Sequence, residues 1–141
     1  MKSGLDMVKD GFTVLNIPAL TDNISGNVYM LERPKNSTEE DVVINSLPIT
    51  ADQFQNGVFN VNIHVPNLNP KINGKLDDTI PNVPRLKAIT DIVVKLLNLH
   101  DGFDFSFSLS NGGQPIRDTD LNWYFNIRVN YYAFQQNYLN I

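Results

Sequence analysis

Cysteine is absent from this 141-residue sequence, and its absence excludes several kinds of chemistry. The chain can form no disulfide, bind no zinc through thiolates and use no cysteine nucleophile. Apolar runs of about 20 residues, long enough to cross a bilayer, are also lacking. The start, Met1–Asp6, has no apolar stretch of the kind found in signal peptides. We therefore expect a protein made and used in a cytoplasm, or carried in a particle assembled there, with no membrane contact.

Charge is scarce as well. Charged residues make up 18% of the chain, against about 25% in an average soluble domain. Uncharged polar residues, above all asparagine, take their place. The net charge of -4 gives no general attraction to phosphate backbones or anionic membranes. A polar but lightly charged surface is typical of regions buried between subunits, which favours a protein that assembles.

No arrangement of residues typical of catalysis is found. His64 lies among asparagines and His100 follows a predicted helix, and neither has the partner that a helical zinc pair requires. Asp118 and Asp120 form an Asp-x-Asp motif, but Arg117 is adjacent and no further acidic residue follows at the spacing of a metal-binding loop. We predict that the protein is not an enzyme and has no cofactor and no metal site. The enzymatic alternative is a metal-dependent hydrolase or nuclease that uses Asp118 or Asp120.

The first half of the chain predicts one helix followed by strands. Apolar residues spaced three and four apart form a single stripe between Leu5 and Leu15, and Pro18 ends the segment, so we predict a helix over 3–16. Asn56-Gly57 is a turn signal. Apolar runs, the last of them alternating with polar residues, predict three strands over 28–31, 41–47 and 59–65.

The second half predicts an arm, a helix and a hairpin. The stretch 66–84 has no periodicity and carries four prolines, so we predict an extended loop or arm. Pro84 suits the first turn of a helix that apolar spacing extends to 98. Alternation predicts strands over 103–109 and 121–133, joined as a large β-hairpin. This order predicts one α+β domain over 1–141, with a mainly antiparallel sheet and two helices packed on one face.

The long final strand presents one face of uncharged polar and aromatic side chains. This face is neither charged enough to prevent edge pairing nor apolar enough for a core, so we predict that the strand lies beside another chain. A central place within its own sheet is the alternative. Stacking on nucleobases is disfavoured because Arg128 is the only cation between Leu121 and Ile141. The face consists of Asn122, Tyr124, Asn126, Arg128, Asn130 and Tyr132.

Four strand-and-turn phrases stand out in the first half of the sequence: Ser25–Tyr29, Arg33–Ser37, Glu40–Asn45 and Asn60–Pro66. They resemble small virion proteins in phages of Bacteroidetes-type hosts. The order of helix, sheet with protruding loop, second helix and closing hairpin is similar to that of the bacteriophage tail-terminator and head–tail joining (neck) family.

The resemblance implies a structural protein of the virion that forms a homo-oligomeric ring, commonly of six copies, at the end of the tail tube or at the neck. Its partners would be copies of itself and the tail-tube and neck proteins, while genomic DNA passes through without specific binding. The alternatives are another neck or tail adaptor and a small non-catalytic ligand-binding or interaction domain. Besides the strand face, the predicted subunit contacts are Asn111, Asp118 and Asp120 in the hairpin and Lys71, Lys75 and Asp77 in the arm.

Overall fold

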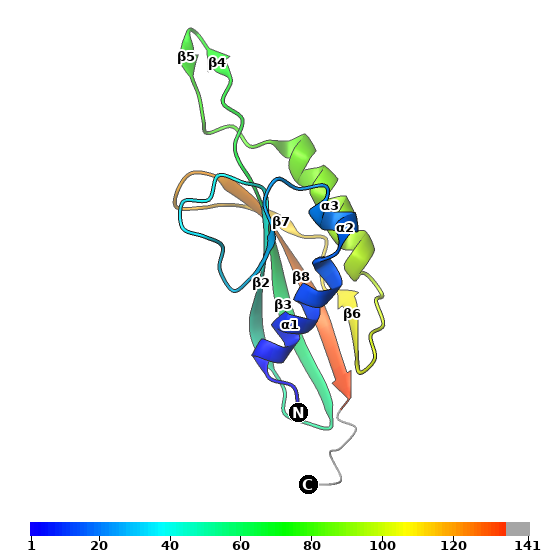
Figure 1. The fold of residues 1–141 in the computed structure, drawn as a ribbon. Helices are drawn as coiled ribbons and strands as arrows, with labels where there is room; N and C mark the ends of the chain where they lie inside the picture. The colour runs from blue at the N-terminus through cyan, green and yellow to red at the C-terminus, as the bar shows by residue number, and fades with distance from the viewer. Residues whose placement is uncertain (135–141) are drawn as a thin grey trace.

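In a computed structural model of the protein, which describes residues 1–134, three helices accompany one six-stranded sheet and a small separate hairpin (Figure 1). The strands follow the order β1-β2-β3-β8-β6, and β7 also pairs with β8. β1 runs parallel to β2, and the other pairs are antiparallel. The mixed composition and mainly antiparallel sheet confirm the predicted α+β fold. The strands are β1 (Val28–Met30), β2 (Asp41–Ile49), β3 (Phe54–Val65), β6 (Phe105–Leu109), β7 (Gln114–Arg117) and β8 (Trp123–Phe134).

Helix α1 (Gly4–Leu15) confirms the first predicted helix. The Ser3 hydroxyl accepts the amide N–H of Asp6, and the Asp6 carboxylate accepts the amide N–H of Ser3, so each residue satisfies a donor at the helix start. Met7, Val8 and Leu15 are buried, whereas Leu5, the first residue of the predicted stripe, is 66% exposed. Pro18, expected only to end α1, also begins the short helix α2 (Pro18–Thr21), where its missing N–H costs nothing.

Helix α3 (Val83–Leu97) lies beside α1 on the same face of the sheet (Figure 1), as predicted. Its start is fixed by Asn82, whose side chain accepts the amide N–H of Arg85, and by Pro84 in the first turn. The apolar residues of alternate strand positions and of the two helix stripes meet in one core, which includes Ile44, Phe59, Val61, Ile89, Val93, Ile127 and Val129.

Strand β3 is longer than predicted because Asn56-Gly57 lies inside it and does not form a turn. The chain reverses instead over residues 50–53, between β2 and β3. The packing around position 57 leaves no room for a side chain. A Cβ there would come within 2.9 Å of the Met7 sulfur and 3.0 Å of Ile49 Cβ. Close packing under α1, not turn geometry, therefore explains this glycine.

The closing hairpin is present, but its first arm is broken. β6 pairs with the second half of β8 and β7 with the first half, so that the two short strands follow one another along β8. The tip of the hairpin lies at 118–122, while Asn111 belongs to the break between β6 and β7. β8 itself lies between β3 and these strands. Both edges of β8 are therefore paired with strands of the same chain. The prediction that another chain lies beside β8 in the sheet is wrong, and the alternative of a central strand is correct.

Residues 66–82, called the arm from here on, leave the body at one end of the molecule (Figure 1). The arm is not a structureless loop: β4 (Lys71–Ile72) pairs with β5 (Lys75–Leu76), and a Leu68–Ile80 bridge lies nearer the base. The turn is Asn73-Gly74, with φ of 51° and 77°. Both values are positive, as a two-residue turn matched to strand twist requires.

Candidate interaction surfaces

The side of the sheet away from the helices, here called the open face, carries a ladder of asparagines. Asn60 Nδ2 donates to Asn45 Oδ1 at 2.9 Å. Asn126 Nδ2 donates to Asn60 Oδ1 at 3.2 Å and to Asn62 Oδ1 at 2.7 Å. Asn126 is only 7% exposed although no helix covers this face. The ladder therefore fixes a flat, uncharged polar surface whose side chains are already ordered.

The strand residues predicted to contact other subunits lie together on this face. The register opposes Asn62 to Asn126, Asn60 to Arg128 and His64 to Tyr124, which places alternate β8 residues on the open side. Arg128 and Tyr132 are exposed, whereas Tyr124 and Asn130 are half-buried. Asn130 Nδ2 donates to Ser108 Oγ at 3.4 Å on β6. Asn122 lies apart from the others, in the turn before β8.

A cleft opens at the arm end of the open face, between the 31–39 loop and the hairpin tip. Its cavity has a volume of about 230 Å³ and is lined by both apolar and polar groups, including Arg33, His64, Asn67 and Trp123. The His64 ring stacks on Tyr124 with centroids 4.9 Å apart. Burial, aided by the nearby Arg33 charge, lowers the pKa of His64 to about 4. The imidazole is therefore neutral at pH 7 and poorly suited to act as a general base there.

Buried charges hold the loop beside this cleft. The Asp41 side chain is fully buried, and its Oδ2 accepts from Ser37 Oγ at 2.5 Å and pairs with Arg33 Nη1 at 3.3 Å. Its Oδ1 accepts the amide N–H of Asn27 at 3.2 Å. A buried carboxylate requires such partners, so Arg33 serves first to neutralise Asp41.

A second pair fixes the start of α3 to the same region. Arg85 Nε and Nη2 donate to the two Glu40 oxygens at 2.5 and 2.9 Å, and Arg85 also donates to the Asn23 carbonyl. Glu40 Oε1 accepts the amide N–H of Ser25, and the Arg85 hydrogen bond is the main cause that lowers the pKa of Glu40. Three of the four phrases Ser25–Tyr29, Arg33–Ser37, Glu40–Asn45 and Asn60–Pro66, namely the first three, thus meet in one hydrogen-bonded cluster that also holds the start of α3.

The acidic residues in the predicted contact regions form turns. Asp118 Oδ1 accepts the amide N–H of Thr119, and Asp120 Oδ1 accepts the amide N–H of Asn122. Asp77 Oδ1 accepts from both the amide and the hydroxyl of Thr79. Within residues 1–134, no three His, Asp or Glu side chains come together in a way that could hold a metal ion. The Asp-x-Asp motif therefore has a structural account in the hairpin turn.

Asn111 has a structural role similar to that of these aspartates. Its Oδ1 accepts the amide N–H of Gly113 at 3.0 Å and that of Arg128 at 3.4 Å, which bridges the break between β6 and β7 to β8. The break itself allows the first strand of the hairpin to bend, as β-bulges do. Asn111 is nevertheless exposed, so its outer side remains open to contact.

Asn67 joins the base of the arm to the hairpin tip, a role that the sequence did not indicate. Its Nδ2 donates to the carbonyls of Asp78 and Leu121, both at 2.8 Å. Its Oδ1 accepts the amide N–H of Trp123, and its own amide N–H donates to Asn122 Oδ1. The two predicted contact regions, the arm and the hairpin tip, therefore lie side by side and share one anchor.

Beyond this anchor, the arm exposes most of its side chains. Leu76 is 69% exposed and Ile72 47% exposed. Lys71 and Lys75 are exposed too, and neither forms an ion pair with another residue of the described part of the chain. An isolated two-stranded hairpin is marginally stable in water, and this one has few contacts with the core.

Comparisons with known proteins leave the family open: neither the models of known protein families nor the curated proteins contain a match to this chain. Among the described residues, no helix has the length and apolar character needed to span a membrane.

Proposed function

We propose that this chain is a non-catalytic structural subunit that self-assembles into a ring, commonly of six copies, at the end of a bacteriophage tail tube or at the head–tail interface. The observation that carries the proposal is the arm. It extends from the body with Leu76 and Ile72 exposed, and apolar side chains in such a position gain stability only when another chain covers them.

The open face supports the same proposal. It offers uncharged polar groups that are already hydrogen-bonded to one another, so contact with a second protein would require little desolvation of unpaired charge. It also carries the exposed Arg128, a residue type favoured in interfaces. The family resemblance in the sequence supports the location in the virion. Acidic groups on the inner rim of a ring would repel phosphates and let DNA pass without binding.

Native mass spectrometry and negative-stain imaging test the proposal, with the purified protein at increasing concentration and with or without tail-tube protein. Closed rings, formed by the protein alone or on the tube end, are the expected result. A monomer that persists at every concentration and ignores tube protein would overturn it. Binding to neck protein but not to tube protein would select the head–tail position over the tube end.

The cleft at Arg33 and His64 favours one alternative, a small ligand-binding domain. Its cavity of about 230 Å³ combines an indole, an imidazole and a guanidinium, which suits a small polar ligand better than a large apolar one. This reading predicts that a metabolite extract raises the unfolding temperature of the wild-type protein but not of the Trp123→Ala variant. Equal behaviour of the two proteins would remove the alternative.

A further inference from the structure

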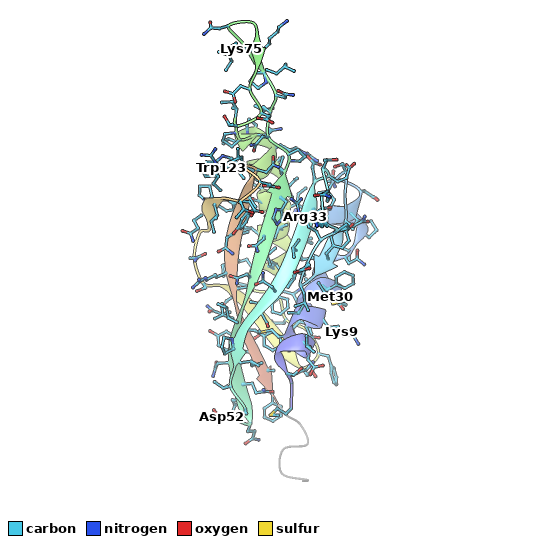
Figure 2. All side chains as sticks on the ribbon, turned by 90° about the vertical axis from the view of Figure 1, so that its left-hand side faces the viewer. Lys9, Met30, Arg33, Asp52, Lys75 and Trp123 are labelled. Atoms are coloured by element: carbon cyan, nitrogen blue, oxygen red, sulfur yellow. The ribbon has the colours of Figure 1, made fainter. Side chains whose placement is uncertain are left out.

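The end of the body opposite the arm carries an exposed aromatic groove. Phe103 is 89% exposed and Phe54 66% exposed, and the Phe54 ring lies 5.1 Å from that of Phe134. Together with Phe105 and Tyr132 they line a hollow of about 390 Å³, here called the end groove. Figure 2 shows the two ends far apart, with Lys75 at one and Asp52, close in sequence to Phe54, at the other.

The exposure of these aromatic side chains to water is unfavourable in free energy. Phe103 also borders a second hollow of about 360 Å³ on the helix side, which Val14, Ile17 and Leu96 help to line. The ring thus stands between two apolar recesses. Clusters of exposed aromatic residues around a recess are typical of binding sites for an apolar anchor of another chain.

The rim of the end groove is acidic. Asp101 and Asp104 both line it. Asp104 pairs with Lys2 at 3.3 Å, while Asp101 forms no ion pair within residues 1–134. The groove therefore favours a ligand that combines an apolar anchor with a positive charge.

The tip of the arm has this combination. Ile72 and Leu76 provide exposed apolar anchors, and the neighbouring Lys71 and Lys75 provide positive charge that no ion pair within residues 1–134 neutralises. Arm and groove lie at opposite ends of the molecule, so one copy cannot join its own two sites. The complementary ligand is therefore the arm of a second copy.

We propose that the arm of one subunit binds the end groove of the next, with Leu76 or Ile72 against the phenylalanine rings and Lys71 or Lys75 beside Asp101. The inference rests on the proposed self-assembly and names the contact that produces it. Because the contact joins two different surfaces, each copy donates one arm and accepts another. Such a contact propagates until the rotation between neighbours closes a ring.

Engineered disulfides test the pairing directly, because the chain contains no cysteine of its own. Lys71→Cys places a thiol on the arm, and Ser106→Cys places one at the lining of the end groove. An equimolar mixture of these two variants is expected to give mainly mixed disulfide dimers on oxidation, and the double variant a ladder of larger covalent species. Lys9→Cys, on the exposed side of α1, replaces Ser106→Cys in the matched control and should give no such ladder.

Charge reversal separates this inference from the proposed function. Lys71→Glu with Lys75→Glu, and separately Asp101→Lys, should each raise the dissociation constant for assembly about tenfold or more, and mixing the two variants should restore pairing.

Rings that survive both changes, or arm-to-arm disulfides in place of mixed ones, would overturn the arm–groove contact and leave self-assembly standing. A wild-type protein that stays monomeric, together with cysteine variants that give no mixed disulfide, would overturn both. A mixed disulfide that appears only after residues 135–141 are deleted would assign the groove to that segment of the same chain and also overturn the proposal.

Discussion

The body of this protein (residues 1–65 and 83–134) and its arm are stabilised in different ways. In the body, β3 and β8 pair along their full length, and every second side chain is covered by α1 and α3. The arm has two short strands, one turn and a bridge, and its apolar side chains face solvent. The body thus holds its fold by contacts within one chain, whereas in the proposed assembly the arm would gain its main apolar contacts from another. Changes in the body should alter folding, and changes in the arm should alter assembly.

The largest effect is expected for Phe59→Ala in the core. Phe59 is fully buried and packs edge to face on Phe107 with ring centroids 5.1 Å apart. Its truncation should lower the free energy of unfolding by about 3–5 kcal/mol. The arm counterpart, Leu76→Ala, should leave that free energy within about 0.5 kcal/mol of wild type. Urea unfolding of both variants, followed by circular dichroism, makes the comparison. A comparable loss for Leu76→Ala would show that the arm packs on its own body.

Gly26→Ala tests the cluster at the start of β2. A Cβ at this position would come within 2.0 Å of Asp41 Oδ1 and 2.5 Å of the Glu40 carbonyl oxygen, so the loop must move and weaken the bonds around both acids. We expect a loss of about 1–3 kcal/mol in the free energy of unfolding. Gly112→Ala is the matched control, since a Cβ there meets nothing within 4 Å. Equal stability of the two variants in urea would refute the role of this cluster.

The pH dependence of stability should reveal His64. Its pKa is about 4 in the folded protein and near its ordinary value of 6.5 in the unfolded chain. As the pH falls from 7 to 5, the unfolded chain takes up a proton that the folded protein does not, so stability is lost; above 6.5 this contribution is fully present. The loss should amount to about 1–2 kcal/mol. His64→Asn should remove it in urea unfolding at the two pH values, and NMR titration should show the wild-type imidazole charging near pH 4.

Regular alternation made most of the body predictable from the sequence. Strands such as β3 and β8 bury one face only, so the core positions recur at every second residue, and the helix stripes are equally regular. The two Asn-Gly pairs show that a local sequence pattern alone does not determine the local structure. Asn56-Gly57 lies within a strand, because Met7 packs over Gly57, whereas Asn73-Gly74 forms the turn of the arm. The dipeptide is the same, and tertiary packing decides between the two outcomes.

The candidate surfaces were predictable only in part. The polar face of β8 could be identified because its residues alternate, but its central place in the sheet depends on long-range pairing with β3. The role of Asn67 also depends on residues more than 50 positions away. The end groove had no sequence signal, since Phe103 continues the alternation of the predicted strand over 103–109. Burial of a single position at the end of a strand depends on where the sheet stops.

Gly74→Ala is expected to have the smallest effect on folding. It also separates the contribution of the arm most clearly from that of the body. Gly74 has a φ of 77° and open space where a Cβ would be, so the change adds backbone strain of about 1 kcal/mol without any clash. Because the arm is a short hairpin outside the core, it should open separately, and the free energy of global unfolding should stay within about 0.5 kcal/mol of wild type. Amide hydrogen exchange at Lys71–Leu76 should become about fivefold faster, and the dissociation constant for assembly should rise by a similar factor, since binding would then have to order the turn. Faster exchange with unchanged assembly would show that the arm conformation is irrelevant to the contact, whereas a fall in global stability would make the arm part of the body.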